Sequence, residues 1–292
     1  MTAASPADRP GRLAVGVVGA GRAGSALAAA LRRAGHRLVA ATPSGRAYPL
    51  LGDLPRRDAA AVAADADLLL LTVPDDDLAG LVRGLVAQDA IRPGQLVLHA
   101  SGVHGLSVLG PATDAGALPL ALHPAMTFSG ETTDLDRMTG TSIAVTAPDE
   151  LRAVGEVLAL ELGGEPVWIP EALRPVWHAG LAHGANHLVT LVGQAADLLT
   201  RAGVDEPKHV LAPLLSAALE GALRLGDQAL TGPVVRGDAR TVAAHLEVLA
   251  ADPARGAYLA LARATADRAL ASGRLRAADA EGLLGVLGEV PR

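Results

Sequence analysis

Four side chains that could bind or protonate a ligand lie within ten residues of an otherwise apolar stretch: His178, His183, Asn186 and His187. On a helix, His178 and Asn186 share a face because eight residues separate them, and His183 and His187 share a neighbouring face. Imidazole and amide groups suit proton transfer and substrate binding. The spacing predicts a polar stripe that faces a substrate, with a solvated or interface face as the alternative.

His183 and His187 could also bind zinc, because side chains at positions i and i+4 lie together on one face of a helix. However, the sequence offers no third ligand nearby and lacks the glutamate of a His-Glu-x-x-His motif. Three consecutive acids at 75–77 precede a helical pattern, where they suit capping and the helix dipole. The sequence therefore predicts no metal centre.

Two further polar groups follow predicted strands, at the end where open parallel sheets bind ligands. Ser101, within His99–Gly105, is predicted to bond substrate or nicotinamide; an ordinary strand-to-loop turn is the alternative. His123, fixed before Pro124, is a candidate acid for reduction of a carbonyl or imine, because histidine titrates near neutral pH. A histidine satisfied by backbone in a turn is the alternative to that role.

A turn at 231–238 connects two predicted helices and contains Arg236. Asp238 is a good N-cap for the helix that follows, so a turn plus a cap explains the segment by itself. Arg236 could also reach a substrate carboxylate from this turn. Both interpretations stay open at this point.

A Gly-x-Gly-x-x-Gly pattern lies between an apolar run at 13–18 and a helical pattern at 25–33. Its glycines would allow a tight turn, close approach of a pyrophosphate and close helix–strand packing. The helix N-terminus would favour negative charge. A close-packed turn that binds nothing is the alternative. The predicted dinucleotide-binding residues are Gly19, Ala20, Gly21, Arg22, Ala23 and Gly24, with Val73 and Pro74 at the end of another strand.

The choice of nucleotide depends on the end of the second strand, where NAD-binding versions of this fold place a carboxylate. The stretch 40–46 has no acidic residue. Thr42 and Ser44 offer hydroxyl groups, and Arg46 and Arg22 offer guanidinium groups suited to a 2′-phosphate. This pattern favours NADP (NADPH); the alternative is that Arg46 is one of many surface arginines.

Composition bounds the class of protein. The 292 residues allow two domains, and a net charge of −6 with interspersed signs argues against nucleic acid or an anionic membrane as partner. The chain has no cysteine, no signal-peptide pattern and no apolar run of membrane-spanning length, so a cytoplasmic location is expected. Lys208 is the only lysine, which leaves one candidate for a lysine-based mechanism.

The hydrophobic pattern predicts an α/β fold: an N-terminal Rossmann domain with a doubly wound parallel sheet, then an all-α domain. Residues 1–12 are expected to be a disordered tail, 13–170 the nucleotide domain and 171–292 the helical domain. Predicted strands are 13–18, 36–41, 67–73, 95–100, 117–122, 141–146 and 166–169, with helices at 25–33, 58–64, 78–87 and 150–162. Further helices are predicted at 171–201, 207–229, 238–251, 254–272 and 276–287.

Taken in order, these motifs resemble bacterial proteins with a Rossmann-like domain followed by a helical domain of unknown function. The motifs are Gly19-x-Gly21-x-x-Gly24, Val73-Pro74-Asp75, His99-Ala100-Ser101-Gly102, His123-Pro124, the 178–186 helix and Gly232-Pro233-x-x-Arg236-Gly237-Asp238. The wider superfamily includes ketopantoate, pyrroline-carboxylate and imine reductases and β-hydroxyacid dehydrogenases. The resemblance implies substrate between the two domains and, for many members, dimers built through the helices.

In β-hydroxyacid dehydrogenases a lysine four residues before an asparagine is the usual acid/base. Asn186 matches the asparagine, but Ala182 occupies the lysine position. We therefore expect an NADPH-dependent oxidoreductase that reduces a small carboxylate-bearing keto acid or imine, with His123 or His183 replacing that lysine. Asn186 completes the catalytic set, and Ser101, His178 and Arg236 bind substrate. The alternative is a non-catalytic NADP-binding sensor or partner-binding protein. Long Ala/Leu faces in 171–290 also predict a homodimer through the helical domain.

Overall fold

The computed structural model describes residues 11–46 and 49–288. The chain forms two compact units that divide between Ala182 and His183. The sequence placed this boundary near residue 170. The difference arises because the segment after the last strand, including Arg174, is hydrogen-bonded to the first unit.

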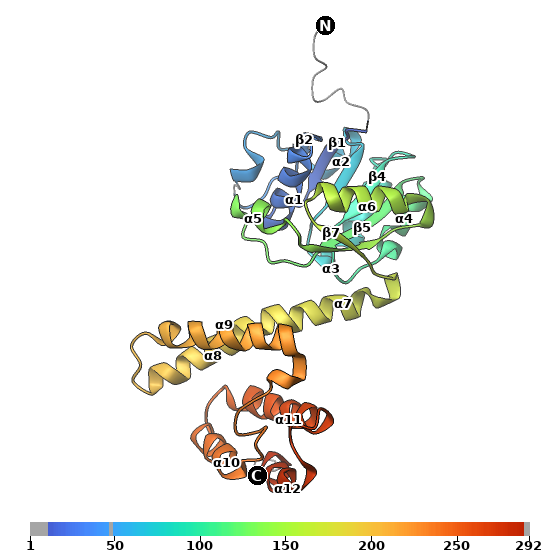
Figure 1. The fold of residues 1–292 in the computed structure, drawn as a ribbon. Helices are drawn as coiled ribbons and strands as arrows, with labels where there is room; N and C mark the ends of the chain where they lie inside the picture. Colours follow the sequence, from blue (N-terminus) through green and yellow to red (C-terminus); the bar gives the residue numbers. More distant parts are fainter. Residues whose placement is uncertain (1–10, 47–48, 289–292) are drawn as a thin grey trace. The chain divides into compact units, whose positions relative to one another are not determined.

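The first unit contains a seven-stranded sheet with the order β2-β1-β3-β4-β5-β6-β7 (Figure 1). Its strands are β1 Ala14–Val18, β2 Arg37–Ala41, β3 Leu68–Leu71, β4 Leu96–His99, β5 Leu118–Pro124, β6 Ser142–Thr146 and β7 Glu165–Trp168. The predicted α/β class is confirmed, and each predicted strand is present within a few residues.

One pairing differs from the predicted all-parallel sheet, since β6 runs antiparallel to β5. Antiparallel neighbours need no crossover helix. The connection between them holds only the short helix α5 Thr133–Arg137, which contacts α1. A parallel connection resumes with α6 Arg152–Glu161, which leads from β6 to β7.

Both faces of the sheet are buried, as the continuous apolar strands require. In β3, Leu68 and Leu70 join one core cluster, while Leu69 and Leu71 join the other. The first cluster includes α1 Arg22–Arg33 and α6. The second includes α2 Ala59–Ala64, α3 Asp75–Ala87 and α4 Gly110–Asp114. Short 3-10 turns occur at η2 Pro49–Leu51, η3 Leu106–Leu109, η4 Asp149–Leu151 and η5 Glu171–Leu173.

The three acids at 75–77 form the first turn of α3, which begins three residues earlier than predicted. None of them acts as an N-cap, because Pro74 occupies that position. Their negative charges stabilise the helix, because they lie at the positive end of its dipole. Across the described residues, no group of three or more His, Asp or Glu side chains could hold a metal ion.

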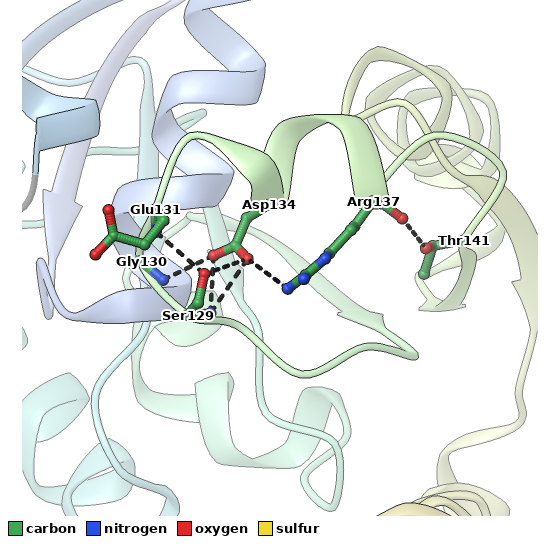
Figure 2. A network of polar contacts seen from close by, with 6 residues as sticks. All are labelled: Ser129, Gly130, Glu131, Asp134, Arg137 and Thr141. Carbon is green, nitrogen blue, oxygen red and sulfur yellow. Dashed lines mark hydrogen bonds and ion pairs between the residues drawn. The ribbon is translucent and has the colours of Figure 1, made fainter. Parts of the chain in front are cut away.

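The loop after β5 is organised by the buried carboxylate of Asp134 (Figure 2). Oδ2 accepts hydrogen bonds from the backbone N–H groups of Ser129 and Gly130 at 2.9 and 2.7 Å. The Ser129 hydroxyl donates to Oδ1 at 2.8 Å, and Arg137 lies 4.0 Å away. These bonds compensate the burial of the charge and fix the loop that follows His123 and Pro124.

The second unit is helical. The chain continues from α7 Arg174–Leu181 through one π-helical turn, Ala182–Asn186, into α8 His187–Arg201. Next come α9 Pro207–Leu225, the 3-10 turn η7 Gly226–Ala229, α10 Ala239–Val248, α11 Arg255–Ala271 and α12 Ala277–Gly288. Buried side chains of α10–α12, such as Val242 and Leu283, form a separate core. No helix within 11–46 and 49–288 has the length and apolar character that crossing a bilayer requires.

Candidate functional site

The glycine-rich turn between β1 and α1 is held by both neighbouring strands. Gly19 has φ +95°, and a Cβ there would lie 2.6 Å from the carbonyl carbon of Thr72. The Thr72 hydroxyl donates to the Gly19 carbonyl at 2.7 Å. The Gly19 N–H donates to the Thr42 hydroxyl at 3.0 Å. The ends of β2 and β3 therefore fix the turn that β1 enters.

Gly24 and Gly21 meet different surroundings within this turn. A Cβ at Gly24 would lie 2.3 Å from both the Gly19 carbonyl oxygen and the Thr72 hydroxyl, so only glycine fits. A Cβ at Gly21 would approach only the Gly19 carbonyl oxygen, at 4.0 Å. Gly21 is the N-cap of α1, where no side chain caps the helix and no acid lies in the first turn. This open, uncapped helix start fits a pyrophosphate.

The other predicted nucleotide residues surround this turn. Ala20 is buried, Ala23 is partly buried and Arg22 is exposed. Gly19 packs against the backbone that leads into Val73, and Pro74 precedes α3. These positions are compatible with the predicted nucleotide site.

The three candidates for the 2′-phosphate differ in their contacts. Thr42 uses its hydroxyl oxygen to accept from Gly19, so it is part of the turn. Ser44 donates to the carbonyl of Arg46 at 2.6 Å. The exposed guanidinium of Arg46 lies 3.8 Å from Glu131, which is part of the loop organised by Asp134.

At the end of β4, His99 and Ser101 form a hydrogen-bonded turn. His99 is buried; its Nδ1 accepts from the Ser101 N–H at 3.2 Å, and its Nε2 lies 2.9 Å from the Gly105 carbonyl oxygen. Burial lowers the pKa of His99 to about 4, although the hydrogen bond to the Gly105 carbonyl raises it. The ring is therefore neutral at pH 7. The Ser101 hydroxyl accepts from the N–H groups of Val103 and His104, as the strand-to-loop alternative describes. Its O–H remains a potential donor.

His123, at the end of β5, lies against α7 of the same unit. The indole Nε1–H of Trp177 donates to His123 Nδ1 at 3.1 Å. The His123 and His178 rings stand edge to face with centroids 5.8 Å apart. A Cβ at Gly102 would lie 2.5 Å from His178 Cδ2 and 2.9 Å from His123 Nε2. The structure thus brings together the predicted residues His123 and His178 beside Gly102, which follows Ser101.

The protonation of His123 differs from the expectation that it titrates near neutral pH. Burial, followed by electrostatic interactions with Arg174 and His178, lowers its pKa to about 4. His123 is therefore neutral at pH 7, so it carries no imidazolium proton that it could donate as an acid. The neutral ring can still donate one hydrogen bond.

Sequence analysis missed Arg174, whose side chain is fully buried. Its Nη1 donates to the Thr146 hydroxyl at 3.0 Å, and its Nη2 to the Ser101 carbonyl at 2.5 Å. Its Nε is buried without a hydrogen-bond partner. Burial lowers the pKa of Arg174 to about 10, so it remains charged at pH 7. In an arginine-rich sequence nothing marks this arginine as buried. The neighbour of His178, Trp177, could have been noticed as one of only two tryptophans.

The remaining predicted residues belong to the second unit. His183 and Asn186 lie in the π-helical turn, a feature often found at functional sites. His183 Nδ1 is 3.0 Å from His187 Nδ1, and both rings are exposed. Arg236 is exposed in the turn before α10. The predicted N-cap is confirmed, because the Asp238 carboxylate accepts from the Thr241 N–H and hydroxyl.

Comparison with known protein families divides the chain in two. Residues 2–124 match the Rossmann-like domain, and residues 141–265 match a domain of unknown function, DUF2520. In sequence the chain is similar to a glycerol-3-phosphate dehydrogenase (NAD(P)+) from Bradyrhizobium sp., with 30% identity over 245 residues. The match covers 78% of this chain and 66% of that relative, just under two thirds of its length.

Solved structures share the fold. A Bacteroides fragilis protein described as an NADP oxidoreductase has a TM-score of 0.73 at 24% identity, over 88% of this chain and 98% of that chain. An Aspergillus terreus reductive aminase in complex with NADPH has 0.62 at 21%, over 90% and 95%. Plasmodium falciparum pyrroline carboxylate reductase with NADP bound has 0.57 at 12%, over 89% and 98%. At these identities the likeness establishes the fold.

Proposed function

We propose that this chain, a Rossmann-like domain followed by a DUF2520 domain, is an NADPH-dependent oxidoreductase that reduces a small carboxylate-bearing keto acid or imine. The observation that carries the proposal is the turn at 19–24. There Gly19 and Gly24 are required by packing, whereas Gly21 leaves the start of α1 open. A bound nicotinamide nucleotide would supply the hydride. The names of three similar proteins, a dehydrogenase, an NADP oxidoreductase and a reductive aminase, support the same class.

NADPH, rather than NADH, is supported by the residues that follow β2. No carboxylate occurs within 40–46, where NAD-binding versions of the fold hold the ribose 2′-hydroxyl. The guanidinium of Arg46 is exposed and lies 3.8 Å from the carboxylate of Glu131. Its planar donors suit a 2′-phosphate. Ser44 and Arg22 are further candidate contacts.

The substrate would contact the residues gathered at the ends of β4 and β5. His123 and Ser101 each retain a group that can donate to a substrate oxygen or nitrogen, and His178 lies beside them. We further propose that His183, Asn186 and Arg236 take part, as the sequence pattern indicates. Arg236 would bind the substrate carboxylate. The cytoplasmic location expected from composition stays a prediction.

Calorimetric titration with NADPH and NADH tests the proposal, followed by absorbance assays with keto acids and with cyclic imines. We expect NADPH to bind at least tenfold more tightly than NADH, and Arg46→Ala to weaken NADPH alone. A charge-assisted contact of roughly 1.5–3 kcal/mol corresponds to that change. Nucleotide binding without turnover on either substrate class would favour the sensor alternative. Failure to bind either nucleotide would reject both.

We also propose that the chain is a homodimer through its helical unit. Seven leucine and valine side chains of α8 and α9 are more than 40% exposed: Val189, Leu191, Val210, Leu214, Leu219, Leu223 and Leu225. Within this unit an apolar groove of about 390 Å³ lies among α8, α10 and α11. Apolar surface of this extent is typical of an interface, and a second copy of the chain would cover it.

A further inference from the structure

The bond between Trp177 and His123 determines which ring nitrogen of the histidine carries a proton. Trp177 Nε1 lies 3.1 Å from His123 Nδ1. An indole N–H can only donate, so His123 Nδ1 must present a lone pair. An imidazolium ion has no such lone pair. Neutral imidazole with an unprotonated Nδ1 carries its proton on Nε2.

His123 Nε2 is directed toward the end of β4. A Cβ at Gly102 would lie 2.9 Å from this nitrogen, so the histidine ring lies directly against the glycine. Within the described part of the chain, Nε2 has no hydrogen-bond partner, and it is not among the buried unpaired atoms. It is therefore an accessible group whose hydrogen bond remains to be made.

Most of the electrostatic interactions around His123 disfavour an imidazolium ion, as the hydrogen bond from the indole does. Arg174 and His178, both on α7, oppose a positive charge on the ring, and Asp75 at the start of α3 favours one more weakly. Burial is the largest cause of the shift, and together with these interactions it lowers the pKa of His123 to about 4. The ring is thus neutral over the whole range above pH 5.

We propose that Trp177 is a positioning residue that holds His123 as the Nε2–H tautomer, a neutral hydrogen-bond donor for the heteroatom of the substrate. The identity of the acceptor rests on the proposed function, but the tautomer is a property of the protein alone. Reduction of a carbonyl or imine places negative charge or a lone pair on the heteroatom, which an N–H oriented in advance stabilises.

Nitrogen NMR of the full-length, ¹⁵N-labelled protein at pH 7 tests the tautomer directly. Among nine histidines, the His123 signals are assigned by their loss in His123→Gln. We expect Nδ1 to show the shift of an unprotonated nitrogen and Nε2 that of a protonated one. Trp177→Phe keeps an aromatic ring but removes the donor, so both nitrogens should move toward intermediate, averaged shifts.

Trp168→Phe is the matched control, since Trp168 is the other tryptophan and donates to Glu156 at 3.0 Å. It should leave the His123 shifts unchanged. A protonated Nδ1 in the unmodified protein would overturn the proposal, and this result needs no variant to fold. An unchanged His123 tautomer in folded Trp177→Phe would overturn the role of Trp177.

Kinetics separates this inference from the proposed function. Once a substrate is found, Trp177→Phe should lower kcat about tenfold while the Kd for NADPH stays constant. An unchanged kcat would remove the catalytic consequence of the tautomer. If the tautomer is as expected but neither nucleotide binds, the proposed function fails and the structural inference stands.

Discussion

Arg174 and Thr146 are joined by a buried hydrogen bond in which Nη1 lies 3.0 Å from Oγ1. The same threonine hydroxyl donates to the carbonyl of Ile169 at 2.6 Å. The end of β6, the residue after β7 and the start of α7 therefore meet at one point. Because the guanidinium also bonds the Ser101 carbonyl, it ties this point to the turn after β4.

Arg174→Met tests whether this arginine serves stability or electrostatics. Burial lowers its pKa from the ordinary value to about 10, so the fold disfavours the charged guanidinium by about 3 kcal/mol. Its removal leaves the Ser101 carbonyl without this donor, which destabilises the fold by about 1–3 kcal/mol. Thr146 keeps its hydrogen bond to Ile169. These effects nearly cancel. We expect a change below about 1.5 kcal/mol in urea unfolding and a raised pKa for His123 by NMR.

Arg174→Lys is the informative comparison. It keeps a buried positive charge but loses the planar fork of donors. We expect it to destabilise the protein more than Arg174→Met does and to leave the pKa of His123 low. The reverse order of stability would show that the hydrogen bonds, rather than the buried charge, dominate at this position.

Stability should depend on pH through His99 and His123. Their pKa values are about 4 in the folded protein, below the ordinary 6.5. Between pH 6.5 and 4 the unfolded chain binds protons that the folded chain does not, so the unfolding free energy falls as pH falls. Each histidine contributes at most about 1.4 kcal/mol per pH unit.

Urea unfolding at pH 7.5, 6.5, 5.5 and 5.0 measures this dependence before most carboxylates titrate. We expect a plateau above pH 6.5 and a decline below it. His123→Gln should make the unfolding free energy depend less steeply on pH, because one fewer proton is taken up on unfolding. Arg174→Met should also make this dependence less steep, because it raises the pKa of both histidines. A flat profile between pH 7 and 5 would contradict the low pKa values.

Three glycine-to-alanine variants separate packing from nucleotide binding. Gly24→Ala should lose both stability and nucleotide affinity, because its Cβ would lie 2.3 Å from two oxygens. Gly21→Ala should fold normally, since nothing but a carbonyl oxygen at 4.0 Å meets its Cβ, yet lose at least tenfold in NADPH affinity. Gly80→Ala, in open space on α3, is the control for both measurements. Unchanged NADPH binding by Gly21→Ala would argue for a turn that binds nothing.

Much of the fold follows from local sequence. Strands such as 67–73 have a continuous apolar character that signals burial on both faces, and the structure places Leu68–Leu71 there. The short helices α4 and α5 and the 3-10 turns were missed, because segments of three to five residues carry too little periodicity. The reversal of β6 was also missed, since strand direction depends on tertiary pairing.

The site was only partly predictable for a similar reason. The glycines and His123 carry spacing or a neighbouring proline that can be recognised along the chain. Arg174 and Trp177 act on residues 73 and 54 positions away, so their roles depend on contacts that spacing does not encode. The low pKa of His123 follows from those contacts and from burial.

Asn186 is predicted to contribute to turnover rather than to nucleotide binding. It lies in the π-helical turn after α7, and the sequence pattern resembles β-hydroxyacid dehydrogenases at this asparagine. Asn186→Ala should therefore leave the Kd for NADPH unchanged and lower kcat/KM at least tenfold on any substrate found, because the variant loses its proposed hydrogen bond to the substrate. Gln194→Ala on α8 is a control. Equal loss in both variants would indicate a general defect of the helix.

The helical unit should mediate self-association. Leu214 and Leu223 on α9 are 63% and 81% exposed, and each would bury apolar surface against a second copy. Light scattering at micromolar concentration should give twice the mass of the 29.4 kDa chain. Leu214→Glu and Leu223→Glu together should yield a monomer, because an interface cannot compensate two unpaired carboxylates. Leu160→Glu, at a position 60% exposed on α6 of the first unit, should remain dimeric. A monomer for the unmodified chain would reject the dimer, whereas a dimer that survives both α9 substitutions would place the interface elsewhere.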